Sequence, residues 1–366
     1  MNTERLHTIA IAVLDDIKTT KLRETLKQLV GALQNQISQP QAPQFQPQVS
    51  EHLKTLYASL SAAPSNDFSP AWKQALQELG LDGLLGKSLQ VRIEGIFERH
   101  PITLSIALEE LSKLQNQLTS YGGALEQIVS GFKQMNIGAE ELEPGQCEIG
   151  VIIPRSAIQN KLGEFADDLE DLDGIFGTFA ELTTGESPPG FEIRSVSSSE
   201  LSVFLEMLPI VAASIALSVE RLVKVYKDIL EIIEKHRELR ERGVTKNQLK
   251  GVEEHIDQRM KDEIEKLTKE LLKKYKVKDE PRRNELRNAV KLSLNKIANR
   301  IDKRYSFEIR AKPISDEEAA EKGTAPEDKE YINAVISASK NVEFLKPGGP
   351  PILSLPESQE NNTNQG

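Results

Sequence analysis

The side chains that could carry out catalysis are few in this sequence and stand far apart. Five histidines are spread along the chain without a close pair, at His7, His52, His100, His236 and His255. The motifs H-E-x-x-H, G-x-S-x-G and G-x-G-x-x-G do not occur. Glu192 and Glu308 are a conceivable acid–base pair, but exposed salt bridges on strands are the commoner use of such residues. We expect no catalytic residue, no cofactor and a non-enzymatic protein, since an enzyme would need distant residues to converge.

The cysteine content limits the covalent and metal chemistry further. Cys147 is the only cysteine of 366 residues, which excludes an internal disulfide and a Cys-rich zinc site. It opens a short apolar segment, so we expect a buried thiol and not a nucleophile. A reducing compartment fits this usage, and residues 1–14 do not resemble a signal peptide. We therefore expect a cytoplasmic protein without a metal site.

Two short patterns resemble ligand-binding loops but lack required residues. Gly86-Lys87-Ser88 resembles the end of a phosphate loop, yet Leu81 stands where the motif needs glycine and a helix, not a strand, precedes it. The run from Asp167 to Gly174 resembles a calcium loop. Its first and last ligand positions are Leu169 and Ala180, which offer no side-chain oxygen. We predict an interhelix turn and an acidic helix face.

Positive charge is concentrated in one region of an acidic chain. The net charge is -10, but residues 261–304 hold 15 Lys or Arg against 8 Asp or Glu. A possible anion or nucleic-acid face repeats every four residues in two sets: Arg283, Arg287, Lys291 and Lys296, Arg300, Arg304. Such a stripe can follow phosphates. The alternatives are pairing with the acidic helices of this chain or of a partner, and plain solvation.

A long heptad pattern is the strongest sign of protein interaction. Ten apolar residues and a final histidine alternate at spacings of four and three from residue 201 to residue 236: Leu201, Leu205, Leu208, Ala212, Ile215, Val219, Leu222, Tyr226, Ile229, Ile233 and His236. After Val219 only this seam is apolar, which is typical of a coiled-coil helix. The predicted interaction seam comprises Leu222, Tyr226, Ile229, Ile233, His236 and Leu239. A return helix at 249–271 within the chain or a second copy would both cover it.

The first half of this pattern is also a candidate membrane segment. Residues 201–219 are apolar on nearly every side and almost long enough to span a bilayer. Glu206 and Pro209 oppose insertion. The alternative is a buried helix of a globular body, kinked at Pro209.

The elements that position these residues are mostly helices. Residues 1–37 are predicted to form one N-terminal helix, 38–50 a Gln/Pro-rich linker and 51–143 a helical domain. A small α/β segment at 144–199 is predicted to hold a buried strand at 147–153, a helix at 156–182 and a strand at 191–196. A third strand is predicted at 305–311.

A repeated tetrapeptide flanks the helical region. Phe191-Glu192-Ile193-Arg194 recurs as Phe307-Glu308-Ile309-Arg310. We interpret both copies as strands of one sheet, with Phe and Ile towards the core and opposite charges able to pair across strands. Between them, residues 200–304 are predicted to form a long helix, ending near 242, and a helical hairpin with a basic return helix. Residues 305–346 add a strand and a short helix, and 347–366 a disordered tail.

The predicted fold class is therefore mainly α, with α+β character. An N-terminal helical region precedes a small sheet of about three strands that bears a long helix and an antiparallel helical or coiled-coil hairpin. The leading functional hypothesis is a cytoplasmic interaction or scaffold protein, with a protein partner or a second copy bound through the hairpin. One alternative is a membrane-perturbing effector that uses helix 201–219. The other is nucleic-acid binding through helix 282–304.

Overall fold

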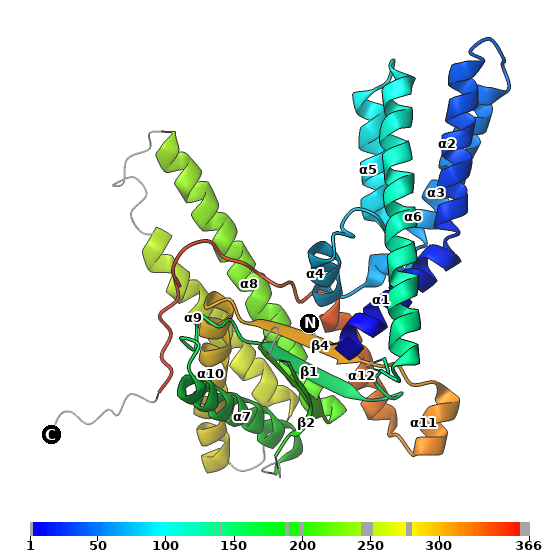
Figure 1. Ribbon diagram of the computed structural model, residues 1–366. Coiled ribbons are helices and arrows are strands. Elements are labelled where there is room, and N and C mark those ends of the chain that lie inside the picture. Colours follow the sequence, from blue (N-terminus) through cyan, green and yellow to red (C-terminus); the bar gives the residue numbers. More distant parts are fainter. Residues whose placement is uncertain are drawn as a thin grey trace. The chain divides into compact units, whose positions relative to one another are not determined.

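A computed structural model describes residues 3–139, 141–186, 190–197, 201–242, 252–275 and 280–358 of the chain (Figure 1). The chain divides into two compact units, Met1–Glu141 and Leu142–Gly366. The described residues form twelve α-helices and one four-stranded antiparallel sheet, and the helical content is 69%. The mainly α fold class with α+β character is thus confirmed.

The N-terminal unit is entirely helical. Its elements are α1 (Thr3–Thr19), α2 (Leu22–Ser38), α3 (Phe45–Ser61), a 3-10 turn (Pro64–Asp67), α4 (Pro70–Glu78), α5 (Gly86–Arg99) and α6 (Leu104–Gln134). The long α6 packs against α1 and α2, and α3 packs against α2 and α5. Leucines at helical spacing, such as Leu26 and Leu29 on α2 and Leu111 and Leu118 on α6, are fully or almost fully buried between these helices.

Two predicted boundaries in this unit are wrong. Residues 1–37 do not form one helix, because Lys21 adopts a left-handed backbone with φ of 50° between α1 and α2. The linker at 38–50 is shorter than predicted, since α3 already begins at Phe45. Pro47 does not prevent this start, because the first turn of a helix needs no backbone N–H donor from its residues.

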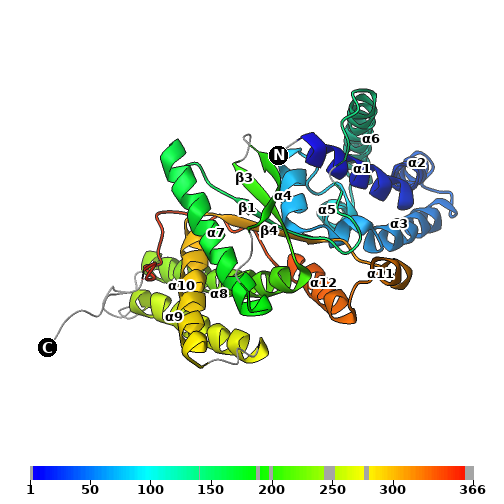
Figure 2. The same cartoon turned by 90° about the horizontal axis from the view of Figure 1, so that it is seen from below.

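The C-terminal unit is built on the antiparallel sheet (Figure 2). Its strands are β1 (Cys147–Ile152), β2 (Glu192–Ser197), β3 (Ser202–Met207) and β4 (Ser306–Ala311), in the order β2-β3-β1-β4. The three strands predicted at 147–153, 191–196 and 305–311 are therefore present. One face carries the apolar side chains of alternate residues, including Ile149, Leu205 and Ile309, which lie opposite one another in register. This face belongs to the main hydrophobic core.

Residues 201–207 correct the predicted long helix. Residues 202–207 form β3 and not the start of a helix, and α8 runs only from Pro209 to Glu241. A proline sterically disfavours helical backbone at the residue before it, whereas proline itself fits the first position of a helix. Pro209 therefore begins α8, where the sequence suggested a kink. Helix α7 (Leu162–Thr184) likewise begins six residues later than the 156 predicted.

Four helices form the body that covers the core. They are α7, α8, α9 (Val252–Lys274) and α10 (Glu280–Asp302). Helices α8 and α10 each contact the other three directly. The 33 residues of α8 extend about 50 Å. After β4, α11 (Asp316–Lys322) and α12 (Pro326–Ser339) replace the single short helix predicted for 305–346. Helix α12 packs against α8 and β4.

The predicted disordered tail at 347–366 is partly wrong. Residues up to 358 are described, and Leu353 and Leu355 are buried in the main core. Residues 359–366 lie outside the described part of the chain. The segment before residue 359 is ordered because Leu353 and Leu355, at alternate positions, bury apolar surface in an otherwise polar stretch.

Candidate protein-interaction site

Helices α8 and α9 form an antiparallel hairpin that is pinned by ion pairs. Arg221 of α8 bridges Glu263 and Glu270 of α9, with 2.6 Å between Arg221 Nη1 and Glu270 Oε2. Arg259 of α9 pairs with Asp228 of α8, with 2.8 Å between Arg259 Nη2 and Asp228 Oδ2. Because such partly exposed pairs contribute at most about 1 kcal/mol each, they fix the register of the hairpin more than its stability.

The six residues of the predicted seam divide into an inner and an outer set. Leu222, Tyr226 and Ile229 are fully buried in the core of the unit, and Ile233 is partly buried against it. Beyond them His236 is partly buried, while Leu239 is 43% exposed. The inner set is thus covered within the chain.

Tyr226 has a second role inside this core. Its hydroxyl donates a hydrogen bond of 2.6 Å to Asp302 Oδ1 on α10. Burial, followed by this carboxylate, raises the pKa of Tyr226 well above its ordinary value. The phenol therefore stays neutral and joins α8 to α10.

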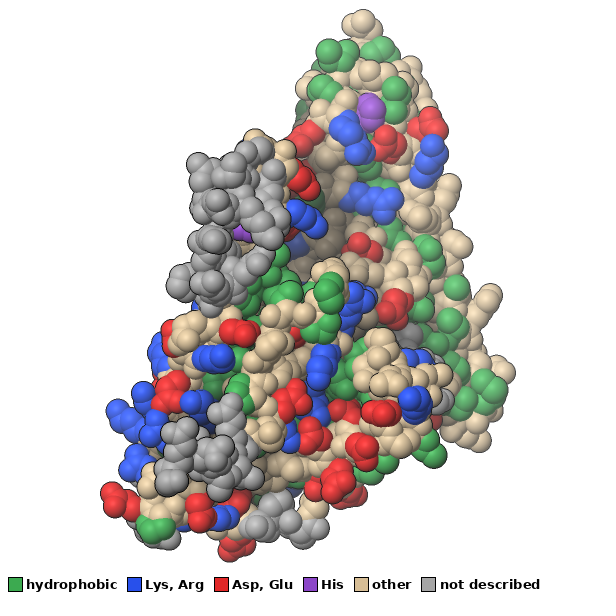
Figure 3. Space-filling model, turned by 90° about the vertical axis from the view of Figure 1, so that its left-hand side faces the viewer, with side chains coloured by type: hydrophobic (Ala, Val, Ile, Leu, Met, Phe, Trp, Pro, Cys, Tyr) green, Lys and Arg blue, Asp and Glu red, His purple; other side chains and the backbone are tan. Residues whose placement is uncertain are grey.

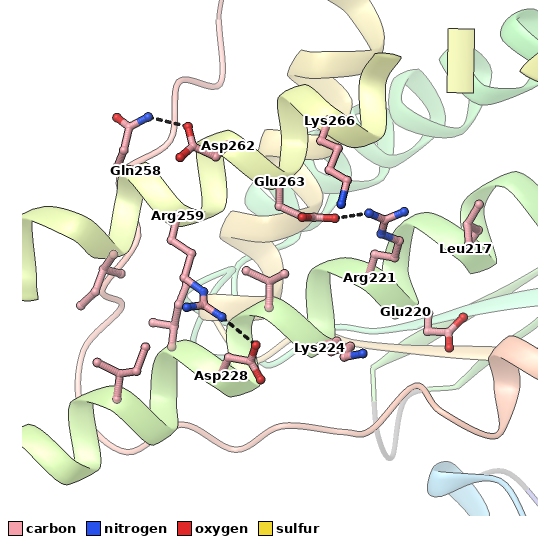
Figure 4. A pocket seen from close by; sticks show the side chains of 14 residues that line it. Leu217, Glu220, Arg221, Lys224, Asp228, Gln258, Arg259, Asp262, Glu263 and Lys266 are labelled. Atoms are coloured by element: carbon pink, nitrogen blue, oxygen red, sulfur yellow. Dashed lines mark hydrogen bonds and ion pairs between the residues drawn. The ribbon is translucent and has the colours of Figure 1, made fainter. Parts of the chain in front are cut away.

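A groove on another side of the hairpin is open. It has a volume of about 1040 Å³, and all the residues that line it belong to α8 and α9. Leu217, Val225 and Ile232 repeat at intervals of eight and seven along α8, so they share one face. With Ile229 and Ile256 they supply its apolar lining. Figure 4 shows the polar residues around them: Glu220, Arg221, Lys224, Asp228, Gln258, Arg259, Asp262, Glu263 and Lys266.

The charges of this groove are balanced. Four of the lining residues are acidic and four are basic. The apolar stripe from Leu217 to Ile232 spans about 22 Å, which is four turns of helix. An apolar lining with a mixed charged rim matches the face of an amphipathic helix. It offers no cluster of convergent catalytic groups.

Most of the predicted basic face on α10 is engaged within the chain. Arg287 and Lys291 both pair with Glu265 of α9, Lys296 pairs with Asp171 of α7, and Arg304 donates to the Gly349 carbonyl at 3.3 Å. Arg300 pairs with Asp168 and Asp171 and its side chain is only 7% exposed. Arg283 is exposed. The structure thus brings the basic face against acidic helices of the same chain.

Acid should weaken the contact between α9 and α10 through Glu265. Hydrogen bonds from Arg287 and Lys291 lower the pKa of Glu265 from 4.5 to about 2. Because the folded-state pKa lies below the unfolded one, the stabilisation is complete above about pH 4.5 and is lost as the pH falls towards 2. We expect the loss of stability caused by Glu265→Gln, measured by urea unfolding, to shrink to zero over that interval.

The control for this pH dependence is Glu285→Gln. Glu285 lies on α10 with a side chain that is 66% exposed, and it pairs with Arg282 three residues earlier on the same helix. Its replacement should have little effect at any pH. A Glu265→Gln penalty that is independent of pH would contradict the assignment.

The repeated tetrapeptides occupy the two edges of the sheet. Glu192 on β2 and Glu308 on β4 are three strand spacings apart, about 14 Å, so they form no acid–base pair. The repeat's arginines instead converge on Glu148 of the central strand β1. Arg310 Nε lies 2.9 Å and Arg194 Nε 3.3 Å from its carboxylate. Sequence reasoning missed Glu148, although an acid within an apolar strand is itself a signal.

The remaining candidate sites have structural roles. Cys147 is buried, and burial first of all raises the pKa of its thiol to about 12, so it is a poor nucleophile. Gly86-Lys87-Ser88 begins α5, where the Asn66 side chain accepts from the Lys87 N–H at 2.8 Å. The acidic run from Asp167 is helical, as part of α7. Within the described ranges no group of His, Cys, Asp and Glu could hold a metal ion.

The candidate membrane segment is divided between two elements. Residues 201–219 comprise β3 and the start of α8. Among the residues that the structure describes, no helix combines the length and apolar character needed to cross a bilayer. Comparisons with protein-family models, curated proteins and solved structures found no match for this chain.

Proposed function

We propose that this protein is a non-enzymatic interaction protein that binds an amphipathic helix of a partner in the groove between α8 and α9. The observation that supports this proposal is the apolar stripe of Leu217, Val225 and Ile232, which lines an open groove with balanced charges on its rim. Apolar area gives such a contact its affinity, and rim charges fix its register. A partner helix with both acidic and basic flanks fits this rim.

The two alternative functions have less support. The face shown in Figure 3 carries Lys or Arg and Asp or Glu side chains interspersed, without the one-sided positive field typical of nucleic-acid binding. The basic residues of α10 already contact Glu265, Asp168 and Asp171. Membrane insertion of 201–219 would require β3 to leave the centre of the sheet.

Ile232→Glu should strongly weaken partner binding without unfolding the protein. Ile232 lines the groove and is 37% exposed, so the change costs little stability but places a carboxylate on an apolar contact surface. With the full-length chain as bait, we expect at least tenfold less capture of the specific partner. Quantitative mass spectrometry measures the captured protein, and sedimentation detects a second copy as the partner.

Leu239→Glu is the matched control. Leu239 lies on the same helix and is 43% exposed, but it does not line the groove. It should capture the partner as the wild type does. A wild-type chain that stays monomeric, and captures only proteins that Ile232→Glu captures equally well, would refute the proposed function.

A further inference from the structure

An extended segment of the chain lies along α10 like a bound peptide. This strap, Pro350–Glu357, has no helix or strand, and Figure 1 shows it running beside the α9 and α10 helices. Leu353 and Leu355 are buried, with exposed fractions of 8% and 5%, whereas Ser354 and Pro356 are exposed. The alternation is that of an extended peptide whose every second side chain enters a groove.

Side chains of the helices, and not a neighbouring strand, satisfy the strap's backbone. Asn299 binds Leu355 twice: its Nδ2 donates to the carbonyl at 3.0 Å and its Oδ1 accepts from the N–H at 3.3 Å. Asn295 Nδ2 donates to the Pro356 carbonyl at 3.0 Å. These three hydrogen bonds are made to the main chain of the strap. Asn299 Nδ2 also donates to the side chain of Glu357 at 2.7 Å.

Two carboxylates make further hydrogen bonds to the main chain of the other half of the strap. Asp302 Oδ2 accepts from the N–H groups of Ile352 and Leu353 at 2.7 and 2.6 Å. Asp257 of α9 accepts from the Ser354 N–H at 3.2 Å. Asn295, Asn299, Asp302 and Asp257 therefore make six hydrogen bonds to the main chain of five consecutive strap residues, 352–356.

Three of the four side chains that bind the strap's main chain come from one face of α10. Asn295, Asn299 and Asp302 are spaced by four and three, so they share one face of the helix, and each is 3–6% exposed. Buried amides and carboxylates are costly without hydrogen-bond partners, and leucine would fill the same positions more favourably in a purely structural core. The strap's backbone satisfies Asn295, Asn299 and Asp302 Oδ2, while Asp302 Oδ1 accepts from Tyr226.

We propose that this groove is a docking site for an extended Leu-x-Leu-Pro peptide of a partner protein, and that the strap is its resident competitor. Backbone hydrogen bonds supply affinity and the two leucine positions supply specificity, as in other extended-peptide sites. The strap joins the unit through Gly348 and Gly349, and Gly349 has a positive φ of 95° that favours glycine. In this proposal the strap leaves about this glycine hinge while the helices stay packed. The site is separate from the α8–α9 groove and does not depend on the proposed function.

The test uses the full chain with a released strap. In the variant Leu353→Asp with Leu355→Asp, the groove is vacated, and a labelled peptide of residues 350–358 is titrated by fluorescence anisotropy. We expect saturable binding to this variant and at least tenfold weaker binding to the wild type, where the strap competes. Adding Asn299→Leu should remove binding, whereas Asn288→Leu, at an exposed position of α10, should not.

A folded variant that does not bind the peptide would overturn the proposal, as would a wild-type dimer that requires the strap, since a second copy would then be the occupant. Hydrogen exchange of the wild type tests release even if the variant fails to fold. The amides of Ile352, Leu353 and Leu355 should exchange at least a hundredfold faster than those of central α10. Equal protection would make the strap a fixed part of the core.

Discussion

Replacing Arg300 with methionine should destabilise the C-terminal unit by about 3–5 kcal/mol. The guanidinium joins α10 to α7 through Asp168 at 2.9 Å and Asp171 at 2.8 Å, and it is 7% exposed. Its loss leaves Asp168, itself 11% exposed, as a buried carboxylate without its cation. Asp171 is one-third exposed and keeps Lys296, so the loss should lie near the lower limit.

Denaturation can be followed separately in the two units. Trp72, the only tryptophan, lies in the N-terminal unit, so its fluorescence should be unchanged while the transition seen by far-UV circular dichroism shifts. Arg283→Met is the matched control, because Arg283 is an exposed member of the same predicted basic face and should change stability by less than about 0.5 kcal/mol. Equal effects of the two substitutions would contradict the internal role of Arg300.

Gly150→Val should be nearly as damaging, at about 3 kcal/mol, for a steric reason. Gly150 on β1 lies opposite Phe204 on β3, and a Cβ at Gly150 would overlap the Phe204 ring. Phe204 is 2% exposed, so its ring has no free space to enter. Urea unfolding should show the loss, and Phe204→Leu combined with Gly150→Ala should be less destabilised than Gly150→Ala alone.

A glycine replacement at position 174 should raise the stability of the unit, in contrast to the loss expected at Gly150. This glycine lies in α7 with open space around its Cα, so Gly174→Ala should stabilise the unit by about 0.5–1 kcal/mol. If Gly150→Val and Gly174→Ala had the same effect, the close approach of Phe204 to β1 would not limit the residue at position 150.

The sequence predicted helices and three of the four strands, but it misplaced the start of α8. Five of the seven residues at 201–207 are apolar, so helical and strand periodicities both fit, and only Leu208-Pro209 indicated the boundary. The break at Lys21 had no such signal, since neither glycine nor proline is present there. Its left-handed backbone depends on tertiary packing, which local patterns do not encode.

The candidate sites were also only partly predictable, because local patterns do not show which residues tertiary packing covers. The heptad seam predicted that α8 would pair either with a return helix of the same chain or with a second copy, and α9 packs against α8. The pattern could not distinguish residues covered within the chain, such as Tyr226, from the open stripe that ends at Ile232. The strap was missed because its order depends on Asn299 and Asp302, which are more than forty residues away in the chain.

The order of the strands has a consequence for synthesis on the ribosome. β1 lies inside the sheet, yet its neighbour β4 follows only after the 153 residues that separate Ile152 from Ser306. At about 5–20 residues per second, translation leaves that edge of β1 without its hydrogen-bond partner for roughly 8–30 s. An apolar strand with an open edge is prone to aggregate. We therefore expect early packing of the α8–α10 helices to protect this edge of β1 until β4 closes the sheet.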